Sequence, residues 1–147
     1  MANARIAKRI IEDGYRNAMV ELVYSLDTTG TFADNAAVIL ADFTNNEPAP
    51  QGAFNGFRVD NLHYSITAPV GAIFYWNSTA DQPIFAVSGS EHMFIKEYLP
   101  GLQPNRAAAG YDGAIDVLLV NIPAGASATL LYIATFVLDM TKLYAAP

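Results

Sequence analysis

Apolar residues recur at every second position near the C-terminal end of the chain, which is the pattern of a β-strand. One face of this segment collects Leu130, Tyr132, Ala134, Phe136, Leu138 and Met140, and the other collects Leu131, Ile133 and Val137. Because both faces carry apolar residues, residues 129–140 are predicted to form a central strand that is covered on both sides.

Runs rich in Val, Ile, Leu and aromatic residues predict further strands, each bounded by turn-forming residues. They lie at 17–26, 36–43, 57–66, 70–76, 83–87, 92–96 and 114–120. At 36–43 a helix is the alternative, since Asp34-Asn35 precedes an Ala-rich run and could cap it. Hairpins are predicted at Ser88-Gly89-Ser90 and at Pro123-Ala124-Gly125, and 97–113 is the longest irregular segment.

About eight short strands at this spacing predict an all-β fold. The expected architecture is an antiparallel β-sandwich, jelly-roll-like, formed by one domain at 17–147. The first 16 residues are expected to form a separate N-terminal arm or short helix.

The N-terminal segment differs from the rest in charge. Residues 1–16 carry a net charge of +2, whereas the remainder carries −8. Ile6, Ile10 and Ile11 stand at helical spacing before Gly14, so either a short amphipathic helix or an extended arm is expected. A segment this short needs a surface to pack on. It packs either on its own domain or on a partner such as a neighbouring subunit. In the second case the expected contact residues are Arg5, Ile6, Lys8, Arg9, Ile10 and Ile11.

Composition narrows the class of protein. Charged residues make up 15% of the chain, against about 25% in an average soluble domain. Charge depletion marks interface cores, so an obligate assembly subunit, and with it a homo-oligomer, is favoured over a surface of neutral polar residues. The pI near 4.6 argues against nucleic acid as a partner, and the lack of cysteine excludes disulfides and thiolate chemistry.

A membrane span is not expected. Residues 117–138 are free of charge, but Asn121, Pro123 and Gly125 interrupt them, and the composition of the second half predicts two strands. The first nine residues lack the apolar run of a secretory signal.

No catalytic, cofactor-binding or metal-binding constellation emerges from the sequence. His63 and His92 are interpreted as isolated structural residues, and Asp112 and Asp116 as solvated turn carboxylates and not as a calcium site. The aromatic residues Phe74, Tyr75, Trp76, Tyr64 and Tyr98 leave a sugar-stacking surface as an alternative.

A succession of turn-forming motifs resembles a family of small virion structural proteins encoded by tailed bacteriophages, over residues 16–142. It begins with Arg58-Val59-Asp60, then Trp76 with the following Asn-Ser-Thr-Ala, Gly89, Pro100-Gly101-Leu102, the Gly110, Gly113 and Ile115 spacing, Ala124-Gly125 and Lys142. The basic, isoleucine-bearing start departs from the family pattern.

The resemblance implies a non-enzymatic β-sandwich of the virion. The first expectation is a capsid decoration (cement) protein, made in the host cytoplasm, that binds the major capsid protein on the outer capsid surface, with the same six N-terminal residues as its expected contacts. A head–tail neck or connector protein and a carbohydrate- or receptor-binding module are the alternatives. The family supplies no catalytic residues, cofactor or metal.

Overall fold

The computed structural model describes residues 3–44, 52–94, 102–123 and 132–145, and these ranges form nine antiparallel strands and one short 3-10 helix. The strands are β1 (Ala4–Asp13), β2 (Asn17–Leu26), β3 (Gly30–Val38), β4 (Phe54–Ile66), β5 (Gly71–Trp76), β6 (Gln82–Ser88), β7 (Ser90–Phe94), β8 (Ile115–Ile122) and β9 (Tyr132–Tyr144), with η1 (Leu40–Asp42) after β3. The all-β prediction is confirmed.

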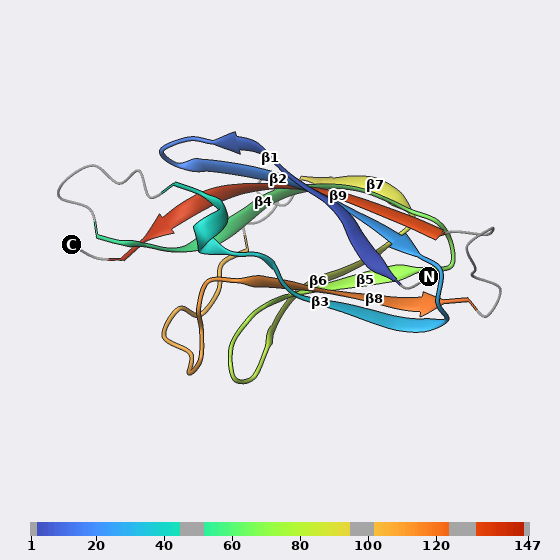
Figure 1. Ribbon diagram of the computed structural model, residues 1–147. Helices are drawn as coiled ribbons and strands as arrows, with labels where there is room; N and C mark the ends of the chain where they lie inside the picture. Colours follow the sequence, from blue (N-terminus) through green and yellow to red (C-terminus); the bar gives the residue numbers. More distant parts are fainter. Residues whose placement is uncertain (1–2, 45–51, 95–101, 124–131, 146–147) are drawn as a thin grey trace.

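The strands form two sheets that pack face to face as a sandwich (Figure 1). The order is β1-β2-β9-β4-β7 in the five-stranded sheet and β3-β8-β5-β6 in the four-stranded sheet. Strands β2 to β9 pair as a nested series, β2 with β9, β3 with β8, β4 with β7 and β5 with β6. A long hairpin rolled around itself produces this nesting, which is the jelly-roll arrangement. The predicted jelly roll is therefore confirmed, and β1 is an added ninth strand.

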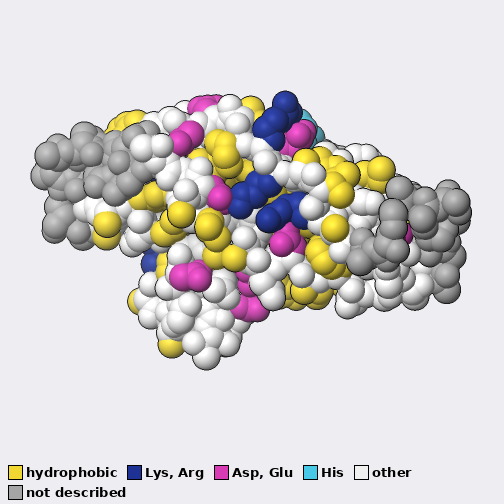
Figure 2. Space-filling model, in the orientation of Figure 1, with side chains coloured by type: hydrophobic (Ala, Val, Ile, Leu, Met, Phe, Trp, Pro, Cys, Tyr) yellow, Lys and Arg dark blue, Asp and Glu magenta, His cyan; other side chains and the backbone are white. Residues whose placement is uncertain are grey.

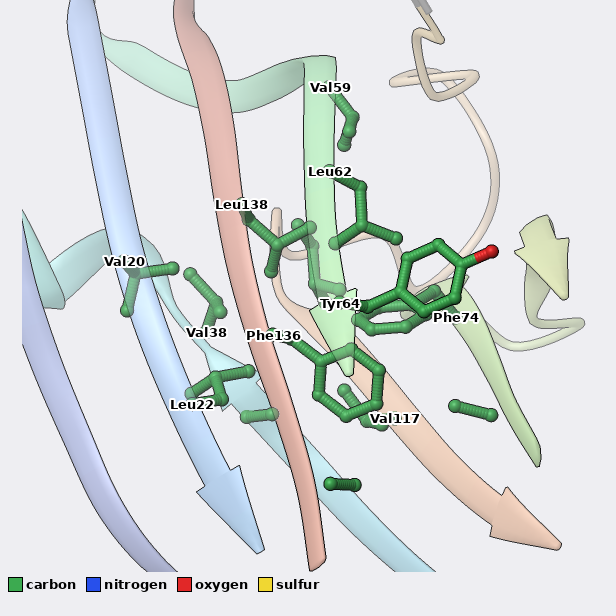
Figure 3. Close-up of a cluster of buried hydrophobic side chains, with 14 of the residues drawn as sticks. Val20, Leu22, Val38, Val59, Leu62, Tyr64, Phe74, Val117, Phe136 and Leu138 are labelled. Carbon is green, nitrogen blue, oxygen red and sulfur yellow. The ribbon is translucent and has the colours of Figure 1, made fainter. Parts of the chain in front are cut away.

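The core lies between the sheets and follows the alternation of the strands. Ala18, Val20, Leu22, Tyr24 and Leu26 of β2 are all fully buried. Figure 3 shows side chains of β2, β4 and β9 directed toward those of β3, β5 and β8. Phe136 and Phe74, one from each sheet, meet edge to face with ring centroids 5.0 Å apart. Burying such a ring stabilises the fold, and truncating it to alanine costs about 3–5 kcal/mol.

Both predicted hairpins are wrong. Strands β6 and β7 flank Gly89 but belong to different sheets, and β8 and β9 are likewise divided between the sheets. The chain crosses from one layer to the other at these points, because the nested pairing requires most consecutive strands to lie in opposite layers. Gly89 makes its crossing with a positive φ of 80°. Residues 124 and 125 of the second predicted hairpin lie outside the described ranges.

Two further expectations require correction. The predicted strand at 36–43 begins earlier, at Gly30, and its second half is replaced by η1. The last strand is central within its sheet, as predicted, but only its inner face is buried, since Ile133 on the outward face is 44% exposed.

The N-terminal segment is a strand of the sandwich. Residues 4–13 form β1, which pairs antiparallel with β2 along its length, so the segment is extended and packs on its own domain, and the helical alternative is wrong. The spacing of the isoleucines is compatible with a helix, but the segment is short and gains more from backbone and side-chain contacts with β2. Tertiary pairing therefore makes it a strand.

Candidate interaction surfaces

The inward-facing row of β1 is mostly charged, because Arg5, Lys8 and Asp13 lie opposite inward residues of β2. Arg5 donates to Asp34 of β3 at 3.0 Å and to the Ala37 carbonyl, and the Tyr24 hydroxyl donates to the same Asp34 oxygen at 2.7 Å. Burial, followed by the neighbouring Asp34 carboxylate, raises the pKa of Tyr24, so the phenol stays protonated as a donor. These contacts join the two sheets where β1 extends the five-stranded layer.

Lys8 continues this row and contacts Asp42 of η1 at 2.6 Å. Figure 2 shows Lys and Arg side chains in a central cluster on the viewed face, next to Asp and Glu side chains and bordered by hydrophobic ones. The predicted contact residues Arg5 and Lys8 therefore have intramolecular partners. Their ion pairs connect the β1 edge of the sandwich to Asp34 of the other layer and to Asp42 of η1.

At the other end of β1, Asp13 pairs with a lysine that is completely buried. The Lys142 ammonium lies 2.5 Å from Asp13, donates to the Thr44 carbonyl at 2.7 Å, and lies 5.5 Å from the Phe54 ring centroid. Partial burial raises the pKa of Asp13, but hydrogen bonds from Lys142 and Thr44 outweigh it, so the pKa lies below its ordinary value of 3.8. This pair binds the end of β1 to the end of β9.

The isoleucines of β1, in contrast, are exposed. Ile6 is 61% exposed, Ile10 37% and Ile11 45%. Ile6 and Ile11 fall at the two register shifts of the β1–β2 ladder, which are β-bulges where the extra residue has no partner opposite. Arg9 also points outward, with its side chain 67% exposed and 3.3 Å from Glu21. Of the six predicted contact residues, these four are available on the surface.

A second candidate surface is the outward face of the four-stranded sheet. It consists of half-buried or exposed apolar side chains on all four strands: Ala33, Ile73, Tyr75, Ala86, Leu118 and Val120. We call this set the four-strand outer face. Its strands carry no Lys, Arg or Glu, and their only charged residues are Asp34, which faces inward, and Asp116.

A hollow of about 290 Å³ lies at one end of the four-strand outer face. Tyr75, Asn35, Asp81 and Asp116 line it. Asp116 is 6% exposed and accepts a hydrogen bond of 2.7 Å from the Ala36 backbone N–H. Burial raises the pKa of Asp116, and the nearby carboxylates of Asp81 and Asp112 add to this rise, against the lowering by the Ala36 bond.

The two histidines are not isolated, contrary to the sequence interpretation. His63 of β4 lies directly opposite His92 of β7, with ring centroids 3.3 Å apart and ring planes 29° apart. Their strands are distant in sequence, and only the register of the β4–β7 pair reveals the contact. Within the described ranges, no group of three or more His, Cys, Asp or Glu side chains is placed to hold a metal ion.

The aromatic residues divide between the core and the surface. Phe74 and Trp76 are buried, at 0% and 4% exposure, and Tyr64 is 9% exposed, so these three do not form a sugar-stacking surface. Tyr75 points outward and lines the hollow. Tyr98 lies outside the described ranges.

The other singled-out motifs that lie within the described residues have structural partners, whereas Pro100-Gly101 lies outside them. Arg58 and Asp60 pair at 2.7 Å and both hydrogen-bond Thr141 of the neighbouring strand, which fastens β4 to β9. Gly113 adopts a positive φ of 82°, and an added Cβ would lie 2.8 Å from Leu40, so only glycine fits there. The Asp112 carboxylate caps this turn by accepting from the Ala114 N–H and from Asn77. These residues shape turns and strand contacts.

No protein-family model, curated protein or solved structure matches this chain. Among the residues that the structure describes, no helix is both long and apolar enough to cross a membrane. The surfaces described above are therefore interpreted from their own chemistry.

Proposed function

We propose that this protein is a capsid decoration (cement) protein that binds the outer surface of a bacteriophage capsid and stabilises contacts between shell subunits. The proposed partner is the major capsid protein. The proposal includes no catalytic step, cofactor or metal ion.

The four-strand outer face carries this proposal. Its apolar side chains are distributed over four strands of a rigid sheet, and its outward positions lack basic residues. Interface cores are depleted of charge in the same way, and a sheet held by a jelly-roll core offers such a surface without a conformational change. Apolar area removed from water stabilises a contact by about 25 cal/mol per Å².

Two further features support the proposal. Jelly rolls recur in viral capsid and lectin domains. The succession of motifs in the sequence also resembles small virion proteins of tailed bacteriophages. The residues that carry the resemblance mainly form turns and strand contacts in this fold. The resemblance therefore supports the β-sandwich architecture, and the proposed function is argued from the four-strand outer face.

Copy number tests the function directly. Quantitative mass spectrometry of purified virions should find this chain in numbers comparable to the major shell protein. About a dozen copies would instead favour the neck or connector role, since such a ring occupies one vertex. Complete absence from virions would overturn both.

A matched pair of variants tests the proposed surface. Val120→Lys places a charge on the four-strand outer face, and Val137→Lys places the same charge on the outward face of the other sheet. Both valines are half-buried and outward-facing on β8 and β9, each of which has strands on both sides. We expect Val120→Lys to weaken binding to undecorated capsids at least about tenfold, or 1.4 kcal/mol, and Val137→Lys to leave it unchanged. Equal binding by both variants would refute this surface.

The hollow beside Tyr75 favours a carbohydrate-binding module as the second candidate. An outward aromatic ring next to Asn35, Asp81 and Asp116 combines a stacking surface with hydrogen-bond acceptors. Nuclear magnetic resonance titration with a panel of oligosaccharides tests it. Saturable shifts that Tyr75→Ala abolishes would favour this candidate, whereas unchanged spectra would eliminate it.

A further inference from the structure

The free edge of β1 gathers most of the exposed large apolar side chains. Five such residues are exposed among the described ranges, and three of them, Ile6, Ile10 and Ile11, lie on β1, with Tyr15 in the turn that follows it. Within the described part of the chain, β1 has a neighbouring strand on one side only. An exposed edge with this composition is a template for pairing with another strand.

We propose that β1 binds β1 of a second copy of this chain in the antiparallel sense, joining the two five-stranded sheets across a two-fold axis. The inference concerns the isolated protein and does not depend on the proposed function.

The order of residues along β1 is self-complementary. When Ile10 of one copy lies opposite Ile11 of the other, Arg9 lies opposite Glu12 and Lys8 lies opposite Asp13, so the paired positions of both copies stay within β1. A two-fold axis repeats each of these contacts, so apolar residues meet apolar residues and residues of opposite charge meet on either side of the axis. The bulge residue Ile11, which lacks a partner in β2, then gains an apolar neighbour.

The facing of the side chains agrees with this register. Arg9 lies opposite Glu21, and Glu12 opposite Met19, in the β1–β2 ladder. Glu21 and Met19 are both outward positions of β2, so Arg9 and Glu12 lie on the same face of the sheet. They can therefore meet across the axis.

The remaining charges of β1 leave the edge free for this pairing. Arg5, Lys8 and Asp13 are engaged with Asp34, Asp42 and Lys142 of their own chain. Arg9, which also lies 3.3 Å from Glu21 of its own chain, and Glu12 are exposed and carry opposite charges. A parallel arrangement would place the cations of both copies next to one another, which like-charge repulsion disfavours.

Sedimentation velocity of the full chain tests the proposal. Over a concentration series from about 2 to 200 µM, we expect a monomer–dimer equilibrium, since an edge contact of this kind is at the small end of specific interfaces. A monomer at every concentration, or a trimer or larger ring, would overturn the proposal.

Substitutions at the edge locate the contact. The double variant Ile10→Lys with Ile11→Lys should weaken dimerisation at least about tenfold. Ile133→Lys is the matched control, because Ile133 is 44% exposed, against 45% for Ile11, and lies on β9, away from β1. All these residues are surface-exposed, and circular dichroism will show whether each variant keeps the fold. Dimerisation that the double variant retains, or that Ile133→Lys abolishes equally, would contradict the β1 contact.

A charge exchange tests the register, and every variant is made in a Glu21→Gln background because Glu21 lies 3.3 Å from Arg9 of the same chain. Arg9→Glu alone and Glu12→Arg alone each place like charges opposite one another and should weaken the dimer. The combined variant Arg9→Glu with Glu12→Arg restores opposite charges across the axis, and association should recover. Failure of the combined variant to recover would refute the antiparallel register.

Discussion

The two sheets of this sandwich share one core but differ sharply in charge. The strands of the four-stranded sheet carry two charged residues, Asp34 and Asp116. Those of the five-stranded sheet carry Arg5, Lys8, Arg9, Glu12, Asp13, Glu21, Arg58, Asp60, Glu91, Asp139 and Lys142. Among the residues of the strands, charge is therefore concentrated in the five-stranded layer.

The two layers therefore differ in the interactions that stabilise them. The five-stranded layer supplements its apolar core with ion pairs, above all along β1 at the edge of that sheet. The four-stranded layer has an apolar outward face as well as an apolar inward face. A surface of this composition is typical of a contact with another protein.

The largest expected effect comes from breaking the Asp13–Lys142 pair. Asp13→Ala leaves the fully buried Lys142 ammonium without its carboxylate, and the free energy of unfolding should fall by about 3 kcal/mol, as measured by urea denaturation. Lys142→Met keeps the side-chain volume among Phe43 and Phe54 and removes the charge, so it should cost about 1 kcal/mol or less.

The double variant provides the control for this prediction. In a Lys142→Met background, Asp13→Ala should have little effect, because no buried charge remains to be compensated. A loss as large as in the wild type would show that Asp13 stabilises β1 through other contacts.

Asp34→Asn should also destabilise the protein, by about 1–2 kcal/mol. Asp34 is the only carboxylate of the four-stranded sheet with ionic and hydrogen-bond partners in the five-stranded sheet, namely Arg5 and Tyr24, among the contacts that the structure describes. Asparagine preserves the shape but removes the charge that attracts Arg5. Thermal and urea unfolding measure the loss, and a neutral result would contradict the role assigned to this contact.

The Asp13–Lys142 pair also predicts a response to acid. Because the folded-state pKa of Asp13 lies below 3.8, its contribution to stability is present above that value and is lost as the pH falls through the folded-state pKa. Urea unfolding between about pH 2 and pH 6 should show a steeper loss in the wild type than in Lys142→Met. Parallel curves would contradict this contribution.

The smallest effect is expected at Asp116 and has the opposite sign. Its raised folded-state pKa means that its stabilising contribution is present at low pH and is lost as the pH rises through that pKa. Asp116→Asn retains an acceptor for the Ala36 N–H and removes the charge, so it should stabilise the protein by less than about 1 kcal/mol at pH 7. The gain should vanish in acid, where Asp116 is protonated. Destabilisation at pH 7 would contradict it. Asp34→Asn is the matched comparison, because the same substitution in the same sheet should act in the other direction.

Local sequence patterns were sufficient for several elements of the fold. The segment 17–26 forms β2 with the predicted bounds, since its buried residues alternate without interruption and a turn signal follows. The jelly roll itself was predictable as a class from the number and spacing of the strands. The three isoleucines of the first eleven residues predicted that the N-terminal segment packs on a surface, but in the fold these isoleucines are exposed, and pairing with β2 holds the segment in place.

Only tertiary pairing decided the structure of that segment. The spacing of its isoleucines is compatible both with a helix and with a strand that contains β-bulges. The same holds for the sheet to which each strand belongs. Gly89 is an equally good turn residue for a hairpin and for a crossing between layers, and only the nested pairing of all the strands selects the crossing.

For the candidate sites, the sequence indicated which side chains could contact a partner. Contacts within the fold determined which of these side chains remain exposed for such a contact. Arg5 and Lys8 were recognisable as basic residues, but Asp34 and Asp42 are distant in sequence and engage them only in the fold. His63 meets His92 for the same reason, through the register of two strands. Strand propensity is a local property that the sequence by itself determines, whereas partner choice in a sandwich depends on contacts between distant segments, which only the tertiary structure decides.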